Sequence, residues 1–188
     1  MKREFRDALD NSPIIAAIKD DEGLKSCKDI DSSIIFILYG DICTIPEIVA
    51  TVKSYGKLAM VHIDLINGLS SKEICVDYIK KYTQADGILT TKPALIKRAK
   101  ELSLYTILRI FVIDSMAYDN IERQLKTAKP DIIEILPALL PKAVKKICSL
   151  SSVPVIAGGL ISDKEDIVTL LNSGIVSISS TNSDIWSL

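Results

Sequence analysis

The sequence predicts an α/β protein, specifically a compact TIM-type (β/α)8 barrel with a shortened last helix. Short apolar runs alternate with amphipathic stretches along the whole chain, a pattern typical of βα units and a parallel sheet. The runs are continuously apolar, which favours strands that are buried on both faces. The rival architecture, an open doubly wound sheet, often carries a G-x-G-x-x-G fingerprint, and the sequence contains none. The closed barrel is therefore the better prediction.

Eight strands are expected, one for each βα unit of the barrel. They lie at Ile14–Ile18, Ile34–Tyr39, Lys57–Ile63, Gly87–Leu89, Tyr105–Ile110, Asp131–Leu136, Val153–Ala157 and Ile175–Ser179. Eight units in 188 residues leave roughly 23 residues for each, which is compact for this fold. Only nine residues follow Ser179, so the last helix has room for little more than a turn or two.

The stretches between these strands carry helix start signals. Proline is tolerated as a first helical residue because that amide is unpaired, and the prolines in such places are Pro46, Pro93 and Pro141. Ser70 with Glu73, and Ser162 with Glu165, match the S-x-x-E capping box. In that motif the serine accepts a hydrogen bond from a free amide of the first turn. We therefore expect Ser70 and Ser162 to cap their helices.

The composition is that of one ordinary soluble domain spanning residues 1–188. The chain has 23 basic and 24 acidic residues, and its net charge of −1 argues against a protein that coats nucleic acid through bulk charge. No apolar run reaches the roughly 18 residues of a membrane span, and residues 1–7 do not resemble a signal peptide. The four cysteines form no C-x-x-C pair, which favours reduced thiols. We expect a cytoplasmic protein without membrane contact.

Functional groups of such barrels gather at the carboxyl ends of the strands. Arg109 and Glu134 lie near the ends of neighbouring strands at matching parity, so we expect them side by side at the mouth. They would form a structural ion pair, contact a ligand, or do both. Asp64 would also point to the mouth, with His62 one layer deeper. His62, the only histidine of the sequence, is either a core residue that hydrogen-bonds Asp64 or a catalytic group. The absence of a second histidine argues against a metal site.

The last two strands end in a pattern that suits a phosphate. Gly158 and Gly159 follow the seventh strand, and Ser180, Thr181 and Asn182 follow the eighth. Glycines let backbone amides approach an anion closely, and the loops after these two strands are the usual phosphate site of barrels. The alternative is that both loops need glycine and a serine cap for tight turns alone.

An enzyme would need further groups. Asp64 or Glu134 would serve as general acid or base, and Lys19 or Lys92 would in principle form a Schiff base. No nucleophile lies at a short spacing from an activating partner, and no metal cluster is evident. The residues alone leave an enzyme and a ligand sensor as alternatives, and we assign no catalytic residue, metal or cofactor.

Several strand-end segments, considered together, resemble the glycerol uptake operon antiterminator family. They are NSPIIAAI (11–18), VHIDLINGL (61–69), GILTTK (87–92), KPDIIEILP (129–137), AGG (157–159) and STNSDIW (180–186). The resemblance runs from about residue 11 to the C-terminus. It implies a non-catalytic, barrel-like protein that senses glycerol 3-phosphate. When liganded, such a protein acts on the leader RNA of glycerol-utilisation genes and prevents premature termination.

The resemblance also implies roles for residues at the mouth. It assigns a phosphate cradle to Gly158, Gly159, Ser180, Thr181 and Asn182. It assigns the glycerol part of the ligand, or the charges around it, to Asp64, Arg109 and Glu134. Antiterminators often act as dimers, so a homo-oligomer is a further expectation.

Leader RNA would need a basic surface. The basic residues that cluster on two expected neighbouring helices are Lys80, Lys81, Lys92, Lys97, Arg98 and Lys100. Together they would attract phosphates without sequence preference. The alternative is a pair of ordinary solvated helix faces, since no aromatic RNP pattern is present. The alternative function is therefore a barrel enzyme, or a sensor without RNA binding, that takes a small phosphorylated metabolite.

Overall fold

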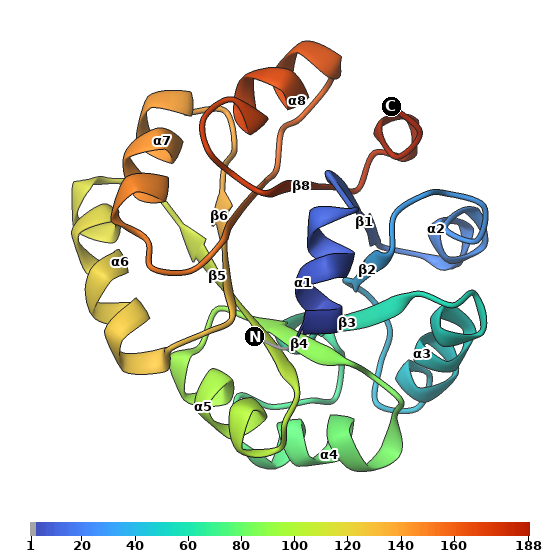
Figure 1. The fold of residues 1–188 in the computed structure, drawn as a ribbon. Helices are drawn as coiled ribbons and strands as arrows, with labels where there is room; N and C mark the ends of the chain where they lie inside the picture. The colour runs from blue at the N-terminus through green and yellow to red at the C-terminus, as the bar shows by residue number, and fades with distance from the viewer. Residues whose placement is uncertain (1–2) are drawn as a thin grey trace.

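The computed structural model describes residues 3–188 and shows a closed barrel of parallel strands (Figure 1). The strands are β1 (Ile14–Ile18), β2 (Ile34–Ile37), β3 (Leu58–His62), β4 (Gly87–Thr90), β5 (Tyr105–Phe111), β6 (Ile132–Leu136), β7 (Val155–Gly158) and β8 (Ser177–Ser180). Each strand pairs with the next in the chain, and β8 pairs with β1 to close the ring. Every strand begins and ends within about two residues of its expected bounds. The predicted (β/α)8 barrel is confirmed.

Helices surround the strands. They are α1 (Arg3–Asp10), α2 (Asp21–Ser26), α3 (Ile45–Ser54), α4 (Ile74–Tyr82), α5 (Pro93–Glu101), α6 (Ser115–Ala128), α7 (Pro141–Leu150) and α8 (Lys164–Leu171), with short 3₁₀ turns η1 (Ile63–Leu65) and η2 (Ser183–Ile185). Within residues 3–188, β8 is followed by η2 alone, in agreement with the shortened last helix. Pro93 and Pro141 begin α5 and α7, whereas Pro46 is the second residue of α3.

One helix that the sequence pattern did not predict closes an end of the barrel. Figure 1 shows α1 lying across the middle of the ring of strands. Phe5 and Leu9 of α1 are buried among residues of the barrel interior, and the Phe5 ring stacks on Tyr105 at 4.3 Å. Tyr105 is the first residue of β5, so α1 covers the amino-terminal end. The opposite end stays available for a site.

The strands are buried on both faces. Outward-facing residues such as Leu108 and Ile133 pack under the helices, while Met60, Ile107 and Ile132 fill the interior together with α1. Because side chains alternate along a strand, the interior positions that follow these three are His62, Arg109 and Glu134. The next layer toward the mouth is therefore polar.

Both serine caps were wrong. Helix α4 begins at Ile74, and the hydroxyl of Ser70 contacts Cys75 Sγ at 3.3 Å instead of capping the helix. Helix α8 is capped by Asp163, whose carboxylate accepts the amide of Asp166 at 2.9 Å. Ser162 lies one residue earlier and donates to the Asp166 carboxylate. At α8 the carboxylate of Asp163 takes the cap position, where its negative charge also faces the positive end of the helix.

The remaining composition predictions concern cysteine and the membrane. All four cysteines, which lie within residues 3–188, are free thiols. Over the same residues, no helix has the length and apolar character needed to cross a membrane.

Candidate functional site

A buried ion pair lies at the mouth of the barrel. Nε of Arg109 donates to Oε2 of Glu134 at 2.6 Å, and Glu134 has no solvent exposure while the Arg109 side chain retains 10%. The hydroxyl of Ser179 donates to Oε1 of Glu134 at 2.5 Å. The expected neighbourhood of Arg109 and Glu134 is confirmed, and Ser179 extends it to β8. Each oxygen of the buried carboxylate thus has a donor.

Glycine on the intervening strand makes this network possible. Gly158 of β7 pairs with Ser179 of β8, and a Cβ at Gly158 would lie 3.1 Å from Oε1 of Glu134 and closer still to the Ser179 hydroxyl. Gly159 instead has a φ of +80°, in the left-handed region that favours glycine. The structure therefore requires glycine at both positions for reasons that involve no ligand. The part of Gly158 and Gly159 in phosphate binding stays a prediction.

Asp64 lies in η1 and joins the ends of β3 and β4. Its carboxylate accepts bonds from the Thr90 hydroxyl, from the amide and hydroxyl of Thr91, and from Nζ of Lys92 at 3.1 Å. Burial raises the pKa of Asp64, but the Thr91 amide, Lys92 and the two hydroxyls outweigh burial, so the pKa is lowered. Asp64 is therefore an ionised tether between two rim loops. Lys92 is part of this tether and also bonds the Ser71 hydroxyl.

His62 is not satisfied by Asp64, contrary to one of the two expectations. The side chain is 3% exposed, and its Nδ1 is buried without a hydrogen-bond partner among residues 3–188. Burial, followed by the positive charge of Arg109, lowers the pKa of His62 to about 4, although Asp64 acts in the opposite direction. The imidazole is therefore neutral near pH 7. No group of three metal-ligating side chains exists within the described part of the chain.

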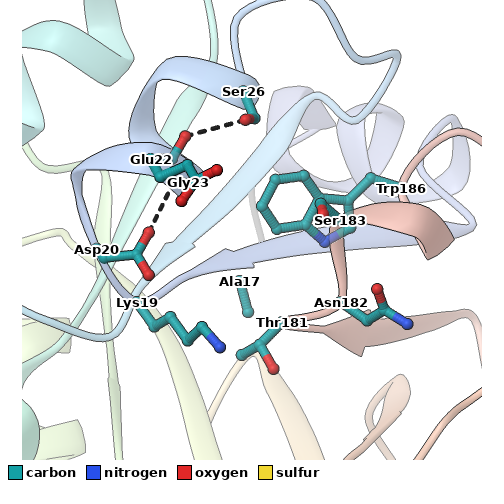
Figure 2. Close-up of a pocket in the computed structure, with 10 residues that line it drawn as sticks. All are labelled: Ala17, Lys19, Asp20, Glu22, Gly23, Ser26, Thr181, Asn182, Ser183 and Trp186. Carbon is teal, nitrogen blue, oxygen red and sulfur yellow. Dashed lines mark hydrogen bonds between the residues drawn. The ribbon is translucent and has the colours of Figure 1, made fainter.

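An open polar cleft of about 450 Å³ lies beside this network, between the β1–α2 loop and the β8–η2 turn. Its lining comprises Ala17, Lys19, Asp20, Glu22, Gly23, Ser26, Thr181, Asn182, Ser183 and Trp186 (Figure 2). Figure 2 shows the amine of Lys19 directed toward Thr181, whereas the Asp20 carboxylate turns toward α2 and accepts the Gly23 amide. The cleft thus has a basic, hydroxyl-bearing side and an acidic side.

Only part of the expected phosphate cradle lines the cleft. Thr181 and Asn182 line it, but Gly158, Gly159 and Ser180 do not. Ser180 is buried, its hydroxyl accepts the amide of Asn182, and its carbonyl accepts Nε1 of Trp186. Ser180 therefore holds the turn that presents its neighbours. Lys19, considered from the sequence only as a possible Schiff-base lysine, directly follows β1 and also lines the cleft.

The six basic residues expected to contact RNA differ in their exposure and in their partners, and their contact with RNA stays a prediction. Helices α4 and α5 are neighbours (Figure 1), and the exposed lysines on them are Lys80, Lys81, Lys97 and Lys100. Arg98 instead bonds Asp77 and Glu101, Lys100 bonds the carbonyl of Lys129, and Lys92 lies at the mouth. Two of the six, Arg98 and Lys92, are therefore ion-paired with carboxylates of the protein.

Comparison with known proteins places the chain in one family. The uncharacterised Escherichia coli K12 protein YgcP is 41% identical over 180 residues, covering 96% of this chain and 94% of that protein. The glycerol uptake operon antiterminator regulatory protein of Listeria monocytogenes superposes with a TM-score of 0.90 at 30% identity, over 94% of this chain and 95% of that one. An antiterminator-related protein of Thermotoga maritima gives 0.82 at 32% identity, over 93% and 98%. The family model of the glycerol-3-phosphate responsive antiterminators matches residues 14–186, and the chain belongs to this family.

Proposed function

We propose that this protein is a glycerol-3-phosphate-responsive regulator of transcription antitermination. Glycerol 3-phosphate binds at the barrel mouth, and the liganded protein binds leader RNA of glycerol-utilisation genes. Membership of the family supports this function. The observation that supports ligand binding is the open polar cleft beside the buried polar network. Strand β8 connects the two, because Ser179 belongs to the network and Thr181 lines the cleft.

The phosphate occupies the basic side of the cleft. Lys19 supplies a cationic donor, and Thr181 and Asn182 supply a hydroxyl and an amide. Phosphate is bound best by several donors of which at least one is charged. The acidic side does not oppose this arrangement strongly, because the Asp20 carboxylate is turned toward α2 and bonded there.

The glycerol part reaches toward the ion pair. Ser179 lies two residues before Thr181, and two extended residues span at most roughly 7 Å, so a three-carbon ligand fits between the cleft and the network. The ion pair uses Nε of Arg109, which leaves the Nη groups as donors for a hydroxyl. Asp64 is tethered by Thr90, Thr91 and Lys92, so we assign it to holding the rim.

The enzyme alternative is weaker. Its expected acid or base is either Asp64, whose carboxylate is ion-paired with a lowered pKa, or Glu134, which is fully engaged by Arg109 and Ser179. Lys92, one of the two possible Schiff-base lysines, is held between Asp64 and Ser71. Neither carboxylate is free to move a proton of a substrate.

Calorimetric titration with glycerol 3-phosphate tests the ligand half. Glycerol and inorganic phosphate serve as ligand controls. Saturable binding is expected, and Lys19→Ala weakens it by roughly 10- to 100-fold because a charge-assisted bond is lost. The matched control is Lys25→Ala, an exposed lysine in the last turn of α2 that does not line the cleft. Absence of saturable binding, or equal loss in both variants, would refute the proposed site.

A further inference from the structure

The only histidine of the chain occupies an unusual position. His62 ends β3 and is 3% exposed, yet its Nδ1 has no hydrogen-bond partner among residues 3–188. Buried polar atoms of side chains almost always have a partner in the protein or a bound molecule. Leaving one without a partner costs about 1–3 kcal/mol, so this orphan nitrogen needs an explanation.

The fold directs this side chain into the barrel. Met60, two residues earlier on β3, belongs to the interior core, and alternation puts His62 on the same face one layer nearer the mouth. Arg109 lies close enough for its charge to lower the pKa of the imidazole. His62 therefore belongs to the polar layer that also contains Arg109, Glu134 and Ser179.

The neighbouring groups do not use the imidazole. The Asp64 carboxylate is occupied by Thr90, Thr91 and Lys92, and Nε of Arg109 bonds Glu134. The two carboxylates of this layer are thus engaged, whereas Nδ1 of His62 is buried without a partner among residues 3–188.

We propose that Nδ1 of His62 hydrogen-bonds a hydroxyl of the bound polyol phosphate and thereby determines specificity. The proposal rests on the proposed function in placing a ligand at the mouth. A neutral imidazole offers one donor and one acceptor, and a hydroxyl both donates and accepts, so either tautomer of His62 makes the bond. Inorganic phosphate does not extend to this layer, and a deoxy analogue that lacks the contacted hydroxyl leaves Nδ1 as open as before.

Nitrogen NMR of the imidazole tests the contact directly. Because the chain has one histidine, tag-free protein labelled with ¹⁵N gives one pair of imidazole resonances. The Nδ1 resonance is expected to move on saturation with glycerol 3-phosphate and to stay in place with inorganic phosphate. A panel of other phosphorylated polyols is titrated in parallel.

Calorimetry of variants tests the energetic role. His62→Phe is expected to weaken glycerol 3-phosphate binding about tenfold, the worth of one hydrogen bond. The phosphates of propane-1,2-diol and propane-1,3-diol each lack one hydroxyl. The analogue without the contacted hydroxyl should bind wild type and His62→Phe equally. His62→Asn, whose amide lies near the place of Nδ1, should recover part of the affinity.

The outcomes separate this inference from the proposed function. If glycerol 3-phosphate fails to bind but another phosphorylated polyol moves the Nδ1 resonance, the proposed effector is wrong and the role of His62 stands. If no member of the panel moves the resonance, the inference is overturned. It is also overturned if His62→Phe folds normally and weakens all the phosphates equally, because His62 then acts only through the structure.

Discussion

At the scale of single residues, the most consequential group is the Glu134 carboxylate. It has no solvent exposure, and the protein offsets the cost of its burial with Arg109 and Ser179, one on each oxygen. The pair is structural before any ligand arrives. The Nη donors of Arg109, which the pair with Glu134 does not use, remain for a ligand.

Removing one partner of this pair should be costly. Arg109→Met leaves a buried carboxylate without its cation, and we expect it to lower the free energy of unfolding by about 3–5 kcal/mol. Urea denaturation at pH 7 measures the change. The matched control is Lys126→Met, which breaks an exposed pair with Glu122 and should cost less than about 1 kcal/mol. Similar values for both variants would contradict the structural role of the pair.

His62 should make stability depend on pH. Its pKa is about 4 in the folded protein against an ordinary 6.5, so between these values the unfolded chain binds a proton that the folded protein does not. The free energy of unfolding is therefore expected to fall by about 3 kcal/mol as pH drops from 6.5 to 4. His62→Gln should remove this part of the dependence. Urea denaturation of both proteins across that range measures it, and parallel curves would disprove the buried, neutral imidazole.

The residues of the site were predicted unevenly from the sequence. Strand parity correctly placed Arg109 beside Glu134, because alternation fixes which face a side chain occupies. Parity does not say what a side chain bonds after the strand has ended. The tether of Asp64 to Thr91 and Lys92, and the missing partner of His62, depend on loop geometry that no spacing in the sequence encodes.

At the scale of elements, strands were predicted better than helix starts. Each strand is a short apolar run bounded by polar turns, so burial alone defines it. A helix start depends on which of several polar side chains reaches a free amide. Around residue 163, Ser162, Asp163 and Asp166 compete for that role, and Asp163 prevails. A motif search that considers only serine and glutamate misses this outcome.

The cap of α8 offers a direct test at this scale. Asp163→Ala removes the acceptor for the Asp166 amide and should destabilise the protein by about 1 kcal/mol. Ser70→Ala should leave stability within about 0.5 kcal/mol, because Ser70 caps no helix. Thermal or urea unfolding measures both. A larger cost for Ser70→Ala than for Asp163→Ala would restore the capping box as the correct interpretation.

At the scale of the whole molecule, a short turn rather than a full helix lines one side of the mouth. The three-residue turn η2 follows β8 within the described residues. The cleft occupies this place, between residues of α2 and residues 181–186. The turn that follows β8 thus contributes to the site as well as to the fold.

The mouth and the exposed lysines are joined by one helix. Lys92, tethered to Asp64 at the rim, immediately precedes α5. Helix α5 carries the exposed Lys97, and the neighbouring α4 carries the exposed Lys80 and Lys81. A ligand that changes the rim therefore has a short physical route to this surface. The route supports coupling only if the ligand binds the RNA-competent state more tightly than the other state.

This coupling leads to the last prediction, which concerns the affinity for leader RNA with and without saturating glycerol 3-phosphate. RNA binding should tighten when glycerol 3-phosphate is bound, and by linkage RNA should tighten the binding of glycerol 3-phosphate by the same factor.

A triple change of Lys80, Lys81 and Lys97 to Ala should weaken RNA binding and flatten its salt dependence. Each lost phosphate contact should reduce the slope of log K against log salt concentration by about 0.7 for single-stranded RNA. The same variant should bind glycerol 3-phosphate normally in the absence of RNA, because none of the three lysines lines the cleft. Fluorescence anisotropy at several salt concentrations measures these quantities, with Lys25→Ala as the control for loss of an exposed charge. RNA affinity that is indifferent to the ligand would leave the protein a sensor whose output is something other than RNA, since occupancy of the mouth would then favour no RNA-binding state.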